Sequence, residues 1–325
     1  MWELGHNNWI KYGWTDKLNA EWVPGDQLFV DYLNNGMLIA DMDAISAAHL
    51  AIDAIVKTYP APYTLMCSGG VDSQAMLYAW HTSGHKFEVI SVRYKSIGQF
   101  FNEYDLVCLS QISQKFNIPI NYVDFDIINF LENDLSLTAK INDCDSPQIC
   151  THIKFLESVS SGTAIFAGNF LIPDGTSVIN YTLFGMHRHA LINRRIKIIP
   201  NFFTFTPELA YSFIEKVFDN TNKKINNTID TTIKNTTYLD SGFDILIPEI
   251  KYFDNGPVTK FTGFETLKEY YEGFGDKVDK FTRFKFSSKE SDRVFDILFR
   301  YPYEGSGLCK QSYRPMGLIK RKNNV

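Results

Sequence analysis

Two adjacent glycines flanked by serines, in the run Ser68-Gly69-Gly70-Val71-Asp72-Ser73, are the residues of this chain best suited to chemistry. An apolar segment precedes them and a helical pattern follows, so the chain must turn sharply between a strand and a helix. Glycine permits that turn and lets consecutive backbone N–H groups point into one concavity. The helix N-terminus adds unpaired N–H groups and a positive dipole end, and Ser68 and Ser73 can donate hydrogen bonds without adding bulk. The run therefore predicts a site for phosphate groups.

Asp72 is the residue of this run that does not suit a phosphate site by itself. Its carboxylate would repel phosphate oxygens, so it needs another task. Two tasks are open: Asp72 orients the loop, or it helps to hold Mg²⁺ against the phosphates. Other phosphate motifs do not explain the run, because the chain has no Gly-Lys-Ser/Thr of the Walker A type and no Gly-x-Gly-x-x-Gly after an expected strand.

The hexapeptide in its strand–loop–helix setting resembles the PP-loop signature of the N-type ATP pyrophosphatases, which include GMP synthetase, NAD synthetase, asparagine synthetase and tRNA thiolases. The resemblance covers roughly residues 60–200. It implies that ATP is cleaved between its α- and β-phosphates, with pyrophosphate held in this loop and Mg²⁺ held by Asp72. AMP passes to a carbonyl or carboxylate oxygen of a substrate, and a nitrogen or sulfur nucleophile then displaces it. Such catalysis rests on positioning and charge neutralisation.

The same resemblance implies further site residues. Family members bind adenine beside the end of the second strand, so Val92 and Arg93 are candidates for nucleotide contact, although Arg93 is equally consistent with an ordinary surface residue. Gly168-Asn169 follows a later strand and resembles a second ligand-binding turn of the family. Ligands of open parallel sheets collect at the carboxyl ends of the strands, so these segments should converge with the phosphate loop.

A leaving pyrophosphate also needs a positive charge near it. Several basic residues lie beyond the Gly168 turn, and a solvated surface position is the ordinary role for any one of them. From this group, Arg188 and Arg195 are predicted as catalytic cations. His187 and His189 alternate as if on a strand, but two histidines alone make a weak case for a metal site.

Cys150 is open to two interpretations. Residues 146–155 resemble the segment of tRNA 2-thiouridylases that carries a catalytic cysteine, and a cysteine near a helix N-terminus is nucleophilic. Thiolation normally uses a second cysteine, for which Cys144 and Cys309 are available. The alternative is a small residue packed at the start of a helix.

These residues favour an ATP-dependent, adenylate-forming ligase that uses a nitrogen nucleophile and is nearest to the synthetase domain of asparagine synthetase. No nucleophilic Cys follows Met1, so no glutaminase domain is expected and ammonia, an amine or a partner must supply nitrogen. The first alternative is sulfur transfer through Cys150. An alternative of another class is a nucleotide-binding scaffold or assembly protein without catalysis. The partners implied are ATP, Mg²⁺ and an unidentified acceptor substrate. Whether the protein forms a homo-oligomer is left open by the sequence.

The pattern around these residues predicts an α/β fold with a doubly wound, mainly parallel sheet. Apolar strands alternate with amphipathic helices, which is typical of βαβ units with right-handed crossovers and helices on both faces. Strands are expected at 63–67, 87–94, 120–125 and 164–167, and helices at 42–58, 73–82, 103–116 and 149–159.

Beyond the sheet, the chain is expected to contain two further regions. Residues 1–41 are a Trp-rich extension, residues 42–200 the PP-loop domain, and residues 201–325 a mostly helical region that covers the site. Within the last region, the polar run 220–237 has no clear period and is interpreted as a flexible loop, whereas 264–273 and 289–300 are expected to be helical.

Composition restricts the class of protein. The formal net charge of −5 argues against a general nucleic-acid-binding surface, while a local basic groove stays open. The five cysteines are too scattered for a disulfide scaffold, and no stretch approaches the roughly 18 apolar residues of a membrane span. No signal peptide is evident, so we expect a cytoplasmic protein.

Overall fold

The computed structural model describes only part of the chain. The described residues are 10–14, 28–32, 38–40, 42–135, 137–138, 147–168, 170, 172–173, 178–179, 196–213, 216–217, 231–247, 250–251, 259–260 and 320–322. The α-helices among them are α1 (Ala44–Thr58), α2 (Val71–Ser83), α3 (Glu103–Phe116), α4 (Ile127–Asn129), α6 (Pro147–Phe155), α8 (Pro207–Ser212) and α10 (Thr231–Asp240). None of these described helices is long and apolar enough to cross a membrane.

A central sheet contains five parallel strands. They are β4 (Tyr63–Met66), β5 (Glu88–Ser96), β7 (Asn121–Asp126), β8 (Thr163–Phe166) and β11 (Lys197–Ile199). Their spatial order is β7-β5-β4-β8-β11, and β6 (Gln99–Phe100) folds back antiparallel on the end of β5. In chain order the parallel strands run 3-2-1-4-5, which is a doubly wound arrangement. The predicted fold class is confirmed.

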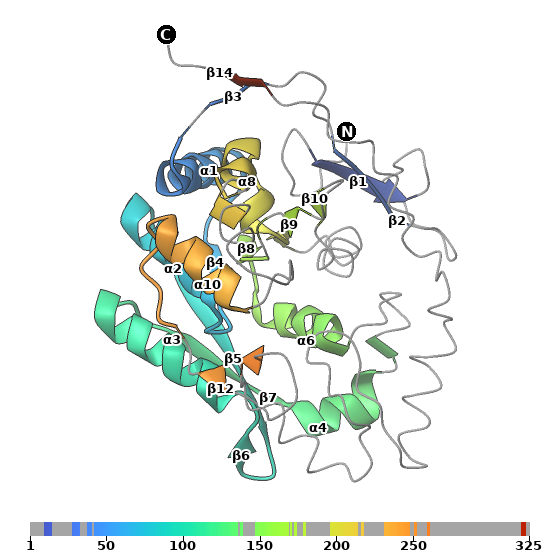
Figure 1. Cartoon of the computed structure of the whole chain (residues 1–325). Coiled ribbons are helices and arrows are strands. Elements are labelled where there is room, and N and C mark those ends of the chain that lie inside the picture. Colours follow the sequence, from blue (N-terminus) through green and yellow to red (C-terminus); the bar gives the residue numbers. More distant parts are fainter. Residues whose placement is uncertain are drawn as a thin grey trace.

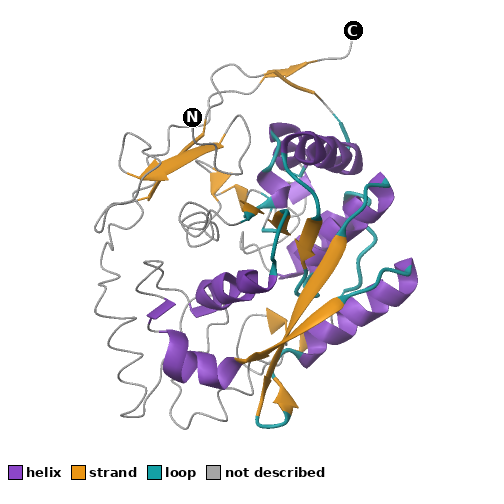
Figure 2. Cartoon of the chain, turned by 180° about the vertical axis from the view of Figure 1, so that it is seen from behind, coloured by secondary structure: helices purple, strands orange, loops and turns teal. Residues whose placement is uncertain are grey.

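The strand order places a topological switch point between β4 and β8. The chain leaves β4 toward β5 on one side of the sheet, and it later returns to β8 on the other side of β4. Figure 1 shows α2 and α3 on one face of the sheet and α6 on the opposite face, and Figure 2 shows the same layers from behind. Because ligands of such sheets bind at the carboxyl ends of strands at the switch point, the ends of β4 and β8 are where a site is expected.

The remaining strands form small two-stranded sheets. They are β1 (Ile10–Trp14) with β2 (Leu28–Tyr32), β3 (Leu38–Ala40) with β14 (Lys320–Lys322), β9 (Ile172–Pro173) with β10 (Val178–Ile179), and β12 (Ile250–Lys251) with β13 (Thr259–Lys260). Only the β3–β14 pair is parallel.

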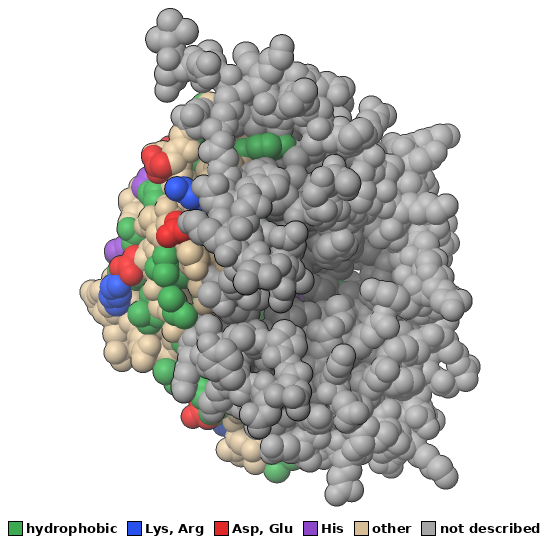
Figure 3. All heavy atoms as spheres, viewed as in Figure 1, with side chains coloured by type: hydrophobic (Ala, Val, Ile, Leu, Met, Phe, Trp, Pro, Cys, Tyr) green, Lys and Arg blue, Asp and Glu red, His purple; other side chains and the backbone are tan. Residues whose placement is uncertain are grey.

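One hydrophobic core joins residues on both sides of position 200. It contains apolar side chains of α1 and α2 together with Phe202, Phe203, Phe213, Tyr238 and Phe243. The rings of this group lie 5–6 Å apart, for example 5.2 Å between Phe203 and Tyr238. The described surface, in contrast, mixes hydrophobic side chains with charges of both signs (Figure 3).

The prediction of a flexible loop over residues 220–237 was wrong for its C-terminal part. Residues 231–237 belong to α10, whose Tyr238 is fully buried among the aromatic rings of the core. Threonine and asparagine are poor helix formers in isolation, but burial against the rest of the protein outweighs that preference. The predicted helices 264–273 and 289–300 lie outside the described residues.

Candidate phosphate-binding site

The predicted phosphate loop lies at the switch point. Strand β4 ends at Met66, and Cys67 still donates a backbone hydrogen bond to Ile90 of β5 at 2.9 Å. The chain then turns through Ser68, Gly69 and Gly70, and α2 begins at Val71 with Gly70 as its N-cap. The loop therefore connects a buried central strand to the N-terminus of a 13-residue helix, as the sequence predicted.

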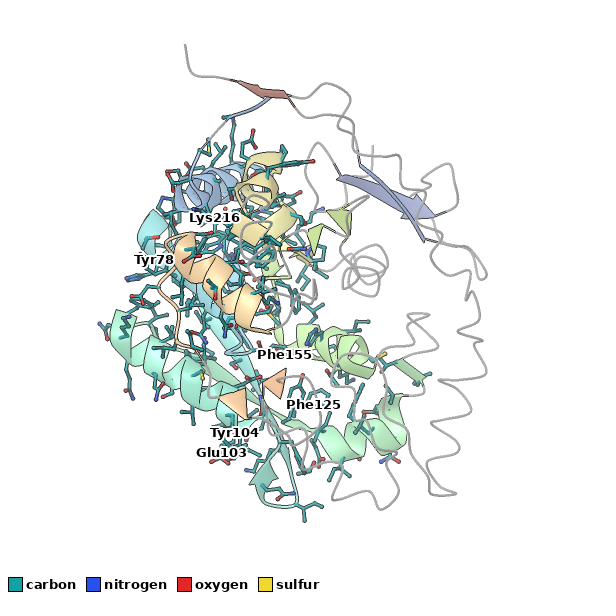
Figure 4. All side chains as sticks on the ribbon, viewed as in Figure 1. Tyr78, Glu103, Tyr104, Phe125, Phe155 and Lys216 are labelled. Atoms are coloured by element: carbon teal, nitrogen blue, oxygen red, sulfur yellow. The ribbon has the colours of Figure 1, made fainter. Side chains whose placement is uncertain are left out.

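Gly69 is required by the shape of this turn. Its φ of +90° is in the region that favours glycine, and a Cβ atom there would lie 2.0 Å from the backbone oxygen of Asp105. Asp105 belongs to α3, whose first turn carries the labelled residues Glu103 and Tyr104 in Figure 4. The loop is thus packed tightly against α3, so its backbone direction is held by a neighbouring helix.

The two serines of the run organise the loop from within. Ser73 Oγ accepts a hydrogen bond from Gly69 N at 3.0 Å and donates one to Gly70 O at 2.8 Å. Ser68 Oγ accepts from Gly70 N at 3.2 Å. The N–H groups of residues 71–73 have no partner within α2, because they belong to its first turn. The N-cap residue Gly70 provides no side-chain hydrogen bond to them. These N–H groups, at the positive end of the helix dipole, are the donors available to an anion.

Gln74, which the sequence did not single out, ties the loop to a distant segment. Its Nε2 donates to Gly69 O at 2.8 Å, and its Oε1 accepts from the backbone N–H of Leu246 at 2.7 Å. The side chain is fully buried. The loop is therefore held in place by α2 and by the segment that follows α10.

Asp72 is held by two side chains of α10. Lys234 Nζ lies 2.5 Å from its Oδ2, and the Tyr238 hydroxyl donates to its Oδ1 at 2.7 Å. Burial, together with the neighbouring Asp72 carboxylate, holds the pKa of Tyr238 well above its ordinary value, so the phenol stays protonated as a donor. Lys234 places a cation at the N-terminus of α2. The sequence does not indicate this role for Lys234, because the polar run 220–237 predicts a loop.

A magnesium ion could use Asp72 as a ligand, because Mg²⁺ is usually held by one or two carboxylates together with substrate phosphates and water. Within the described ranges, no group of three or more His, Cys, Asp or Glu side chains is arranged to hold a metal. The residues present therefore fit an ion held mainly by nucleotide phosphates, with Asp72 as the protein ligand. Its carboxylate is at present paired with Lys234.

Val92 and Arg93 lie on β5 beyond the end of β4. Asn102, which precedes α3, forms hydrogen bonds with the β5 backbone at this position. Its Nδ2 donates to Val92 O at 2.8 Å, and its Oδ1 accepts from Tyr94 N at 3.0 Å. Arg93 is paired with Asp124 of β7 at 2.5 Å. Its guanidinium also lies 5.3 Å from the centre of the Tyr122 ring. Nucleotide contact by these two residues stays a prediction.

The turn after β8 lies beside the phosphate loop, because Met66 of β4 pairs with Phe166 of β8. Gly168 has a φ of +64°, and a Cβ atom there would lie 2.2 Å from Cγ of the buried Asn201. Two predicted ends of strands therefore meet at the same edge. Asn169, Arg188 and Arg195, the other predicted residues of this part of the site, lie outside the described residues.

Cys150 is fully buried in the first half of α6. The next residues contact the ends of two strands: Thr151 Oγ1 lies 3.1 Å from the Tyr94 hydroxyl, and the His152 ring lies 5.8 Å from that of Phe166. Burial raises the pKa of Tyr94 to about 12 and lowers the pKa of His152 to about 4. Both side chains are therefore neutral near pH 7. A reactive role for Cys150 stays a prediction.

Comparisons with known proteins add two structures. A scan of family models and a search of curated proteins each give no match. The chain is similar to an NH3-dependent NAD synthetase from Campylobacter jejuni, with a TM-score of 0.29 and 12% identity over 63% of this chain and 98% of that one. It is also similar to the U34-tRNA thiolase NcsA from Methanococcus maripaludis, with a TM-score of 0.29 and 11% identity over 83% of this chain and 82% of that one.

The fold is a doubly wound α/β fold with a glycine-rich loop at its switch point. That assignment rests on the strand order and on the geometry of residues 67–73.

Proposed function

We propose that this protein is an ATP pyrophosphatase of the PP-loop type, which forms an adenylate on a carbonyl or carboxylate oxygen of its substrate. The observation that carries the proposal is the loop at Gly69 and Gly70, which opens α2 at the switch point with Lys234 beside it. This arrangement offers backbone donors, a helix dipole and one cation to a polyphosphate. Val92, Arg93, Gly168 and Asn169 are proposed to complete the nucleotide site.

The residues around Asp72 can change partners when ATP binds. Lys234 neutralises the Asp72 carboxylate at the start of α2, where Asp72 also accepts a hydrogen bond from Tyr238. An incoming polyphosphate offers Lys234 a stronger anionic partner, and Asp72 would then be free to hold a Mg²⁺ ion. When bound, the ion neutralises phosphate charge. Lys234 and the N–H groups of residues 71–73 then stabilise the pyrophosphate as it leaves. Arg188 and Arg195 remain proposed as further cations.

The second half of the reaction is proposed to use a nitrogen nucleophile, ammonia or an amine, as in the synthetase domain of asparagine synthetase. The region 201–325 is proposed to cover the site, and the contacts of Lys234 and Tyr238 with Asp72 support this for α10. Sulfur transfer through Cys150 is the competing proposal. Its test is whether Cys150→Ser abolishes turnover and spares ATP binding.

Product analysis tests the proposal directly. The purified protein is incubated with Mg·ATP labelled in the α- or γ-phosphate, candidate carboxylate acceptors and ammonium. AMP and pyrophosphate in equal amounts, together with acceptor-dependent exchange of labelled pyrophosphate into ATP, are the expected result. Release of ADP and phosphate would contradict it. ATP binding without either reaction would favour a non-catalytic nucleotide-binding scaffold.

A further inference from the structure

Asn235 is a buried amide for which the described part of the chain provides no hydrogen-bond partner. Its side chain is 2% exposed, and neither Nδ2 nor Oδ1 finds a partner within the described part of the chain. Asn102 provides a contrast within the same protein, because it is 3% exposed and both of its amide atoms are bonded. Buried amides are nearly always paired, so an unpaired one needs an explanation, such as a bound water, ion or ligand.

The neighbours of Asn235 on α10 contact the first turn of α2, directly after the phosphate loop. Lys234, the preceding residue, and Tyr238, three residues further on, both contact Asp72. The ring of Tyr238 also packs 5.2 Å from that of Phe170, two residues after Gly168. Tyr238 therefore bridges the loop after β4 and the loop after β8, and α10 lies across the switch point next to α2 (Figure 1).

The buried part of α10 is unusually polar for a helix inside a core. Its described buried residues are Ile233, Asn235, Thr237 and Tyr238. A helix that only packs against a core normally buries an apolar stripe. An asparagine at such a position is unfavourable unless a partner satisfies it, and such departures from ordinary packing are expected at functional sites.

We propose that Asn235 is a binding residue for the acceptor substrate, and that it takes a neutral group with a hydrogen-bond acceptor and donor side by side, the edge of a carboxamide or lactam. This inference rests on the proposed function. A carboxylate has only hydrogen-bond acceptors, so it would leave Asn235 Oδ1 without a donor. Lys234, in turn, is the residue proposed to bind the anionic phosphates. The adenine is expected on the β5 side of β4. Tyr238 of α10 also contacts Phe170 in the chain after β8, and that side of β4 is where an acceptor would meet the α-phosphate.

A pair of matched substitutions tests whether the amide is unpaired in the free protein. Asn235→Leu keeps the branched arrangement of side-chain heavy atoms and removes the amide, so its melting temperature should equal or exceed that of the wild type. Asn102→Leu, the control, breaks two hydrogen bonds and should melt at a lower temperature. If Asn235→Leu melts as far below the wild type as Asn102→Leu does, the amide is satisfied by water in a structural role and the proposal is overturned.

A binding experiment tests the ligand. Acetamide and uracil serve as probes for a free amide and for a nucleobase lactam, and ligand-observed NMR is recorded with wild type and Asn235→Leu in the presence of Mg·ATP. We expect at least one probe to bind the wild type and to lose binding in Asn235→Leu. The probe that binds shows whether the acceptor presents a free carboxamide or a nucleobase lactam. Equal binding to both proteins, or none to either, overturns the proposal.

The affinity for Mg·ATP distinguishes the proposed ATP pyrophosphatase function from the proposed role of Asn235 in acceptor binding. Asn235→Leu should bind Mg·ATP as the wild type does, because the phosphate loop is unchanged. Failure of the wild type to bind ATP would contradict the proposed function, while the melting temperatures and the probe experiment would still decide the role of Asn235. A loss of ATP affinity in Asn235→Leu would instead assign this residue to the nucleotide and overturn the acceptor proposal.

Discussion

Lys234 Nζ lies 2.5 Å from Asp72 Oδ2, a contact that joins residues 162 positions apart in the chain. Both side chains are about three-quarters buried, with 25% and 22% of their surfaces exposed. A cation from the C-terminal half of the protein is therefore placed at the N-terminus of α2, where the phosphates of ATP are proposed to bind.

Lys234→Met should reduce formation of AMP far more than it reduces stability. Methionine preserves the apolar stem and removes the charge. We expect a fall in kcat of about 10²-fold, which is typical for loss of one group that stabilises a transition state. The free energy of unfolding should fall by about 1 kcal/mol, as for a partly exposed ion pair. Steady-state kinetics and urea denaturation measure the two effects.

Lys115→Met is the matched control for this substitution. Lys115 pairs with Asp244 at 2.6 Å, so it also anchors the segment after α10, but it does not contact the phosphate loop. Its loss should leave kcat within about twofold of the wild type, since exposed ion pairs contribute little. Equal effects of the two substitutions on kcat would mean that Lys234 only anchors α10.

Gly69→Ala should destabilise the protein and remove ATP binding. A Cβ atom there meets the backbone oxygen of Asp105 at 2.0 Å, and alanine is also strained at a φ of +90°. We expect a loss of about 2–4 kcal/mol from the two effects. Gly98→Ala is the control: its φ is +78° but its Cβ has open space, so only strain of about 1–2 kcal/mol should appear. Chemical denaturation of both variants separates the clash from the strain.

Stability should fall in mildly acidic solution because of His152. Burial lowers the pKa of its imidazole to about 4 from the ordinary 6.5, so the unfolded chain takes up a proton in a range where the folded protein does not. The contribution of the neutral His152 to the free energy of unfolding is fully present above pH 6.5 and is lost as the pH falls toward 4. It is of the order of 2 kcal/mol, allowing for partial exposure to solvent.

His152→Gln should flatten that part of the curve of unfolding free energy against pH. The same substitution at the exposed His81 is the control for replacement of a histidine elsewhere in the chain. Denaturation with urea at several pH values between 4 and 7 gives the comparison. A wild-type curve that is flat over this range would contradict the assignment.

Cys150→Ser should retain most AMP-forming activity if the nucleophile is nitrogen. The thiol is fully buried within α6, and serine there should cost about 1–2 kcal/mol of stability through burial of a hydroxyl. Cys108→Ser in α3, another buried thiol, is the control for that effect. Loss of turnover in Cys150→Ser alone, with ATP binding intact, would establish sulfur transfer instead.

The phosphate loop and the parallel sheet were predictable because the patterns that specify them are short. Residues 63–77 contain a strand, two glycines and the first turns of a helix in one continuous segment, and the structure has β4, the loop and α2 there. Helix α3 begins and ends at the predicted residues 103 and 116. Alternation of strands and helices was enough to imply parallel pairing and a doubly wound order, since few connections of such units are sterically allowed.

What surrounds the loop was decided by tertiary structure. Lys234, Tyr238 and Leu246 reach Asp72 and Gln74 from more than 160 positions away, and no local pattern specifies such partners. Helix α10 has a polar sequence that predicts a loop, and burial of residues such as Ile233 and Tyr238 in the core stabilises it as a helix. The sequence by itself thus determined the strand, loop and helix start at which phosphate is proposed to bind. Packing alone decided which cation and which buried amide stand beside it, because those contacts exist only once the chain has folded.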